Sequence, residues 1–319
     1  MVFTEQVEAA LAGASALADG PLDEEARSRV LTLMAQGLAA IDAERAERLV
    51  AGLDADAVAS VAAFVAVAAA AHDPVRALAK AMRIDVLEWR EQALEQIVEL
   101  SAERYPERAY RIASELADVY YRSRALAACR AVTPLSELAA ATEGVEQLWA
   151  VAALATVDTE AALTVAAGQP ADERLRMLAR IAGAVAAVDA ERGLGIALGI
   201  KDDFWFDVAL REVAPALAAT DVERALALAE DIEDLDYQAE ALSDIAPFLA
   251  RTDAAGARAL AEGLPQQTET HHALVAIAET LATTDPESAE RLVAEIEDPE
   301  WRARGLIAIA VAWLTTNTR

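Results

Sequence analysis

A segment of about 32 residues recurs along this chain, and the repetition limits the fold more than any other feature. The last three copies begin at Thr220, Thr252 and Thr284 with TDVERALALAED, TDAAGARALAEG and TDPESAERLVAE. Self-similarity at a period of about 20 to 50 residues is typical of solenoids, in which each unit buries its apolar face only against its neighbours. Towards the N-terminus the position of the aspartate is occupied by Asp189, Asp158, Tyr105, Asp73 and Asp42.

Each unit contains two amphipathic helical patterns separated by a short acidic break. In the unit that starts at Asp221, apolar residues follow the i, i+3, i+4, i+7 spacing twice, from Ala225 to Ile232 and from Ala241 to Leu249. The recurring aspartate is suited to cap the first helix, since its side chain can accept hydrogen bonds from the free amides of the first turn. We therefore predict an all-α fold: a single array over residues 1–319, a right-handed α-solenoid of about ten antiparallel helix pairs.

The spacing between copies tightens in the middle of the chain. Tyr105 and Thr133 are 28 residues apart, and Thr133 and Asp158 are 25 residues apart. The missing residues amount to about one and two helical turns, so we expect shortened helices around residues 126–157. A bend there could divide the array into two halves.

The composition favours tightly packed helices and excludes several classes of partner. Hydrophobic residues make up 55% of the 319 residues but aromatic residues only 5%, so alanine, the best helix former, dominates. The formal net charge of -27 is unsuited to nucleic acid, which needs clustered lysine and arginine. The apolar run 57–71 is too short to span a bilayer, so we expect no membrane association. Cys129 is the one cysteine, which excludes an intramolecular disulfide and favours a cytoplasmic location.

One stretch carries a resemblance to a known repeat family. The sequence DPEWRARGLIAIAVAWL, from Asp298 to Leu314, resembles the short HEAT-like repeats of the phycobilisome-lyase type, in which an aspartate-proline turn, an aromatic residue and arginines open the second helix. The openings such as TDPESAE at Thr284 are also similar to tetratricopeptide repeats. The resemblance implies an α-solenoid whose second helices line a concave groove for partners.

Two sets of residues recur at fixed repeat positions, and each has two interpretations. Arginine three residues after the cap either pairs with acids of the neighbouring unit or contacts a ligand; an aromatic near the start of the second helix either fills the joint between units or anchors a partner. The arginines are Arg45, Arg76, Arg108, Arg192 and Arg224, and the aromatics are Trp89, Tyr121, Trp205, Tyr237 and Trp301.

The second helices also carry polar residues on a face that the apolar stripe does not need. Arginines concentrate there in the central units, and acids in the flanking units; guanidinium groups bind carboxylates in a bidentate manner. We therefore predict a non-enzymatic scaffold that binds a protein or peptide, such as an acidic segment. The alternative is an enzyme or small-molecule carrier with its ligand in a central groove near Trp205 and Tyr237. The candidate polar contacts are Arg124, Arg176, Arg180, Arg211, Glu240 and Asp244.

Catalytic and metal-binding patterns are scarce. His271 and His272 are adjacent, with Glu269 nearby, but neighbouring side chains on a helix point about 100° apart and rarely share one ion. The sequence has no glycine-rich phosphate loop and no nucleophile elbow. We expect no catalytic residues, no metal and no cofactor.

The last predicted helix is apolar on all sides. It contains the sequence LIAIAVAWL, whereas the terminal unit of a repeat array needs a polar outer face. A helix that is hydrophobic all round is normally buried. We therefore expect Ile307, Val311 and Trp313 to contribute to a homodimer contact or to be covered by a partner.

Overall fold

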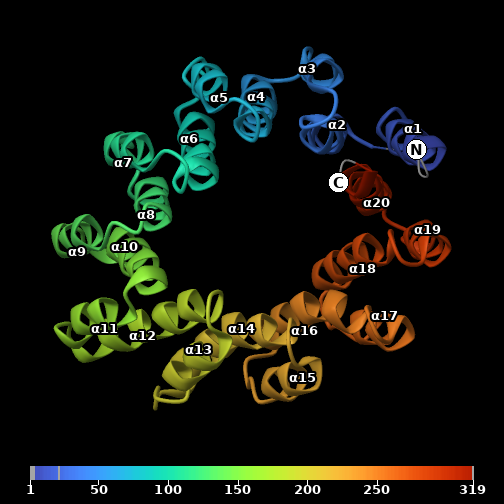
Figure 1. The fold of residues 1–319 in the computed structure, drawn as a ribbon. Helices are drawn as coiled ribbons and strands as arrows, with labels where there is room; N and C mark the ends of the chain where they lie inside the picture. Colours follow the sequence, from blue (N-terminus) through green and yellow to red (C-terminus); the bar gives the residue numbers. More distant parts are fainter. Residues whose placement is uncertain (1–3, 21, 318–319) are drawn as a thin grey trace. The chain divides into compact units, whose positions relative to one another are not determined.

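The computed structural model describes residues 4–20 and 22–317, and within them the chain forms twenty α-helices and no strand (Figure 1). The predicted all-α fold class is thus confirmed. No helix in these described ranges has both the length and the apolar character needed to cross a membrane. The right-handed superhelix stays a prediction.

The helices alternate between the first and second members of the predicted pairs. The first members are α1 (Thr4–Ala18), α3 (Ala43–Val50), α5 (Pro74–Ala81), α7 (Pro106–Glu115), α9 (Val132–Ala141), α11 (Thr159–Ala167), α13 (Ala190–Ala197), α15 (Val222–Glu230), α17 (Ala254–Glu262) and α19 (Pro286–Glu295). The second members are α2 (Glu24–Leu38), α4 (Ala55–Ala70), α6 (Leu87–Ser101), α8 (Val119–Ala128), α10 (Gly144–Val157), α12 (Ala171–Ala186), α14 (Asp203–Ala218), α16 (Leu235–Leu249), α18 (Gln267–Leu281) and α20 (Pro299–Asn317).

The recurring aspartate is the N-cap of the first helix, as predicted. The Asp221 carboxylate accepts a hydrogen bond of 3.0 Å from the backbone N–H of Arg224, and a cap of this kind contributes about 1 kcal/mol. Tyr105 makes no side-chain cap, but Pro106 follows it at the first helical position, where no amide needs a partner. The other capping aspartates are Asp42, Asp73, Asp158, Asp189, Asp253 and Asp285.

Three of the arginines that follow these caps form ion pairs with a glutamate of the preceding repeat. The Arg45 guanidinium donates to Glu8 at 2.9 Å, that of Arg192 to Glu160 at 3.0 Å, and that of Arg224 to Glu191. The structural interpretation is confirmed for these three. The pairs are exposed, so each contributes little to the free energy of unfolding.

The chain forms two compact units. One contains the chain up to Ala69, Ile84–Val86 and the chain from Leu242 on; the other contains Ala70–Arg83 and Leu87–Ala241. In the second unit α8, at the edge of residues 126–157, has ten residues, whereas α10 within that range has 14, close to the 15 and 16 of α6 and α12, so the expected shortening of helices there stays a prediction. Residues 126–157 lie inside this unit, so the shortened repeats do not mark the boundary between the two units.

In the first unit, α20 packs against α1 and α2 from the other end of the sequence, and against α18 (Figure 1). Glycine permits the close approach, because a Cβ atom on Gly37 would lie 2.5 Å from Cγ2 of Val311. The Trp313 side chain is 0% exposed, and its Nε1 donates to the Ala282 carbonyl at 2.5 Å.

This packing corrects the expectation for the last helix. Ile307 and Trp313 are buried, and Val311 is half-buried against α2, all within one chain. The sequence pattern correctly indicated a covered helix. The cover, however, comes from the chain's own helices α1, α2 and α18, so the buried Ile307 and Trp313 are not available as a homodimer contact, whereas such a contact through the half-buried Val311 stays a prediction.

An ion-pair cluster lies at the same junction. Nη2 and Nε of Arg29 donate to Glu300 at 2.7 and 3.0 Å, and Arg304 donates to the same carboxylate at 2.7 Å. The hydrogen bond from Arg29 lowers the pKa of the Glu300 carboxyl below its usual value. The cluster therefore joins α2 to α20 most strongly when Glu300 is ionised.

Candidate functional site

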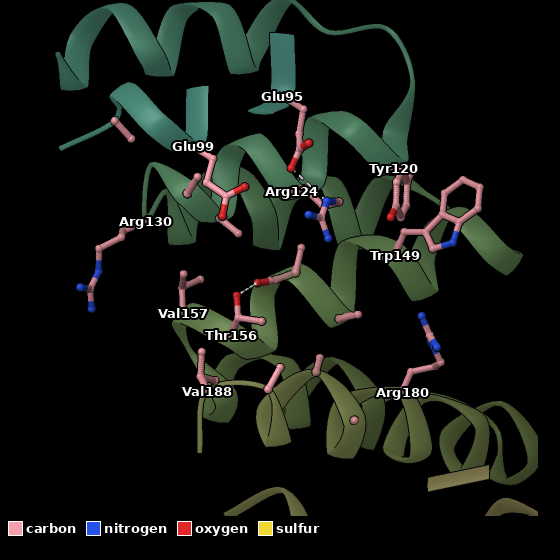
Figure 2. A pocket seen from close by; sticks show the side chains of 18 of the residues that line it. Glu95, Glu99, Tyr120, Arg124, Arg130, Trp149, Thr156, Val157, Arg180 and Val188 are labelled. Carbon is pink, nitrogen blue, oxygen red and sulfur yellow. Dashed lines mark hydrogen bonds and ion pairs between the residues drawn. The ribbon is translucent and has the colours of Figure 1, made fainter. Parts of the chain in front are cut away.

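Four consecutive second helices of the second unit, α6, α8, α10 and α12, border a partly open groove of about 820 Å³, and Figure 2 shows the side chains that line it. Its floor consists of small side chains, so a ligand could approach the helix backbones closely. This follows from the alanine-rich composition of the repeats. The floor residues are Ala102, Ala127, Ala128, Ala152, Ala153, Gly183, Ala184 and Ala187.

Tyr120 and Trp149 form an aromatic wall at one end of the groove. Their ring centroids are 5.4 Å apart with an interplanar angle of 73°, an edge-to-face arrangement. The sequence reasoning missed Trp149 because the shortened repeats disturb the alignment. Trp149 and Arg124 occupy equivalent places, each directly before a fully buried alanine, Ala150 and Ala125, but the sequence alone does not show which alanines are buried.

Arg124 is held at the same end by a buried glutamate. Its Nε donates to Glu95 at 2.9 Å, and its guanidinium lies 5.7 Å from the centroid of the Tyr120 ring. Glu95 is only 3% exposed; burial raises the pKa of its carboxyl, and the charge of Arg124 opposes this shift. Among the described residues, no hydrogen bond engages the two terminal nitrogens of Arg124, which lie toward the groove (Figure 2).

Arg180 lies on the opposite side of the groove and is held in a similar manner. Its Nη1 donates to Glu212 of α14 at 2.5 Å. Gly183 makes room for this pair, because a Cβ atom there would lie 2.0 Å from Oε2 of Glu212. Glu212 also accepts from Arg211 at 3.1 Å, so one carboxylate lies between two guanidinium groups.

Arg130 lines the groove with a backbone conformation that is uncommon outside glycine. Its φ is 54°, in the left-handed region. The N–H of Arg130 donates to the Ala127 carbonyl at 2.8 Å and that of Ala131 to Leu126 at 3.0 Å, the two bonds of a Schellman motif that ends α8. Glycine is the residue usually found at this position, so the arginine side chain is present in spite of a conformational cost.

Only some of the contacts predicted from the sequence line the groove. Arg124 and Arg180 line the groove, whereas Arg176 lies outside the described lining, 3.9 Å from Glu173. Asp244 belongs to the other unit and lies 4.0 Å from His272.

A second predicted set lies together but elsewhere in the second unit. Arg211 donates to Glu240 at 2.6 Å and stacks over Tyr237 at 5.6 Å from the ring centroid. Trp205 lies beside Phe204, with centroids 5.0 Å apart. These residues are not among those that line the groove in the described part of the chain, so the predicted ligand position between Trp205 and Tyr237 does not coincide with it.

The two histidines do not form one site. His271 is buried against Trp301, with ring centroids 5.6 Å apart, whereas Nδ1 of His272 lies 3.2 Å from the Ser243 hydroxyl. The residues that the structure describes contain no group of three or more histidine, cysteine, aspartate or glutamate side chains placed to hold a metal ion.

Neither protein-family models nor curated proteins assign this chain to a family, so its class is inferred from the fold and the groove. No protein-family model matches the chain, and a search of curated proteins gave no significant match. Fold and site define an all-α protein of consecutive helix pairs with an open, mixed-charge groove on its second helices.

Proposed function

We propose that this protein is a non-enzymatic binding module that holds a segment of another protein in the groove between α6, α8, α10 and α12. The observation that carries the proposal is the shape and lining of this groove: about 820 Å³, partly open, with a floor of small residues and an aromatic wall. An open trough admits a polypeptide that continues beyond it at both ends. Exposed aromatic rings are the usual anchors of such contacts.

The proposed partner segment carries an acidic side chain next to an apolar one. The free terminal nitrogens of Arg124 suit a carboxylate, and Arg180 approaches from the facing helix (Figure 2). Glu95 and Glu212 hold these guanidinium groups in position, so binding costs little side-chain entropy. An apolar side chain would then pack on Trp149.

Binding of a small molecule is the second candidate function, and only the volume of the groove favours it. Sites for small molecules commonly measure about 300 to 1,000 Å³, but they enclose most of the ligand surface. An open groove favours a polypeptide over an enclosed substrate.

The proposal is tested by filling the groove. A library of random 12-residue peptides displayed on phage is selected on the wild-type protein, on Ala152→Trp, and on the control Ala190→Trp. Ala152 lines the groove floor, whereas Ala190 begins α13 in the same unit outside the described lining; both are half-buried.

We expect selection of peptides with an acidic residue beside an aromatic or aliphatic one. The affinity of selected peptides, measured by calorimetry, should fall at least tenfold in Ala152→Trp and remain unchanged in Ala190→Trp. Failure to enrich any sequence, or equal binding to Ala152→Trp, would contradict the proposal. A metabolite that co-purifies in native mass spectrometry and is lost only from Ala152→Trp would establish the small-molecule alternative.

A further inference from the structure

A patch of exposed apolar and aromatic side chains lies where α14 and α16 begin, away from the groove lining. Phe204 is 52% exposed and Leu235 is 66% exposed. The Phe204 ring lies 5.0 Å from that of Trp205 and 6.2 Å from that of Tyr237, centroid to centroid. We call these three ring-bearing residues, together with Leu235 two residues before Tyr237 at the start of α16, the aromatic patch.

The fold does not require large apolar residues at this position. In the other unit, the corresponding helices begin with polar residues or proline, such as Gln267 and Thr268 in α18 or Pro299 and Glu300 in α20. Those helices form equally well. The exposed apolar surface at Phe204 and Leu235 is therefore not explained by helix formation, and such a patch on a folded chain indicates a contact with a partner.

The aromatic patch is held in a fixed arrangement by a buried carboxylate. Asp207 of α14 is 5% exposed, and its Oδ2 accepts from the backbone N–H groups of Glu233 and Asp234 at 3.1 and 2.9 Å. These two residues belong to the turn before α16. The carboxylate thus ties that turn to α14, which pre-organises the start of α16 against the start of α14, where the three rings lie.

Acidic residues are concentrated in the chain segments that carry the aromatic patch. The turns before α14 and α16 and the first turns of these helices contain six acids and a single lysine. Asp202 and Asp234 also cap the helices, which keeps their carboxylates at the edge of the patch. The acids are Asp202, Asp203, Asp231, Glu233, Asp234 and Asp236, and the cation is Lys201.

We infer that the aromatic patch is a second docking surface, which binds a basic segment of a partner protein: lysine or arginine side chains flanking an apolar residue. The negative faces of aromatic rings and the carboxylates of the segments that carry the patch both attract cations, and the apolar anchor would bury Phe204 and Leu235. Arg211 already stacks on Tyr237, which shows that a guanidinium fits a ring of this patch. The inference does not depend on the proposed function of the groove, which selects for the opposite charge.

The test uses two fluorescein-labelled 12-residue peptides with the same leucine positions, one with lysine and one with glutamate elsewhere. We expect the lysine peptide to raise the fluorescence anisotropy of the mixture and the glutamate peptide to have no effect. Phe204→Ser and Leu235→Ser should each weaken binding at least tenfold. Val75→Ser is the control, since Val75 is 58% exposed in the same unit and lies on α5.

A charge variant separates this surface from general attraction to an acidic protein. In Asp203→Asn/Glu233→Gln, affinity for the lysine peptide should fall about tenfold and depend less steeply on salt concentration. Three results would overturn the inference. In the first, Leu235→Ser and Phe204→Ser bind the lysine peptide as the wild type does; in the second, Val75→Ser loses as much affinity as they do. In the third, the lysine peptide does not bind the wild type at 1 mM, about the weakest affinity of a specific contact. Loss of lysine-peptide binding in Ala152→Trp would also overturn it, because the groove would then be the site.

Discussion

At the scale of single residues, local chemistry was predictable from the sequence and long-range pairing was not. The capping role of Asp221 depends only on the three residues that follow it, so the sequence pattern was sufficient. The role of Arg124 depends on Glu95, and that of Arg180 on Glu212, which lie 29 and 32 residues away. These separations are close to one repeat. Opposite charges one repeat apart are the signal that would have identified the arginines as already paired.

Arg130 gives a prediction at this scale. Its left-handed backbone favours glycine, so Arg130→Gly should raise the free energy of unfolding by about 1 kcal/mol. Urea denaturation followed by circular dichroism measures the change. Arg122→Gly is the comparison: it removes an arginine from the interior of α8, the helix that Arg130 follows, and should destabilise the protein by about 1 kcal/mol. A loss of stability in Arg130→Gly would show that the side chain contributes more than the strain costs.

At the scale of helices, the sequence predicted the elements well because apolar spacing, caps and turns agree in each repeat. The spacing indicated shortened helices around residues 126–157, but the ten-residue α8 lies mostly before that range and α10 within it has 14 residues, so spacing alone did not locate the short helix. What covers α20 did not follow, since its apolar residues indicate burial but not the identity of the neighbour. The groove was likewise beyond sequence reasoning: its alanine floor is made of residues that look the same as the alanines of the core.

The contact between α2 and α20 gives a prediction for a helix pair. Gly37→Ala places a methyl group 2.5 Å from Cγ2 of Val311, so the urea midpoint should decrease by an amount equivalent to about 1 to 3 kcal/mol. Adding Val311→Ala should restore part of the loss. Gly52→Ala is the control, because no atom lies within 4 Å of its new methyl group, and there we expect little change or a small gain. Equal effects at both glycines would mean that α2 and α20 are not closely packed in solution.

At the scale of the whole molecule, acid should act in opposite directions on the half-buried carboxyl of Glu300 and the buried carboxyl of Glu95. The pKa of Glu300 is lowered by Arg29, so its contribution to stability is present above the ordinary glutamate pKa and disappears as the pH falls through the lowered value. The pKa of Glu95 is raised by burial, so its contribution is present at low pH and is lost as the pH rises through the raised value. The first carboxyl belongs to the unit that joins the two ends of the sequence, and the second to the unit with the groove.

The measurement compares Glu300→Gln with the wild type between pH 3 and pH 7. At pH 7 the variant should unfold more easily by about 1 kcal/mol, a modest figure because Arg29 is partly exposed, and the difference should decrease steadily as the pH falls towards 3. For Glu95→Gln, the difference from the wild type should shift in favour of the variant as the pH rises. A Glu300→Gln effect that does not vary with pH would exclude the ionised carboxylate as its cause.

The packing of α20 on α1 and α2 also affects how unfolding can begin. In an open repeat array each terminal unit has one neighbour instead of two, so the ends fray first and unfolding spreads inward. Here Trp313 of the last helix is fully buried, and the first helices supply the neighbour that the last one would otherwise lack. Amide hydrogens of α20 should therefore exchange with solvent as slowly as those of α18, and the least protected amides should lie in other helices.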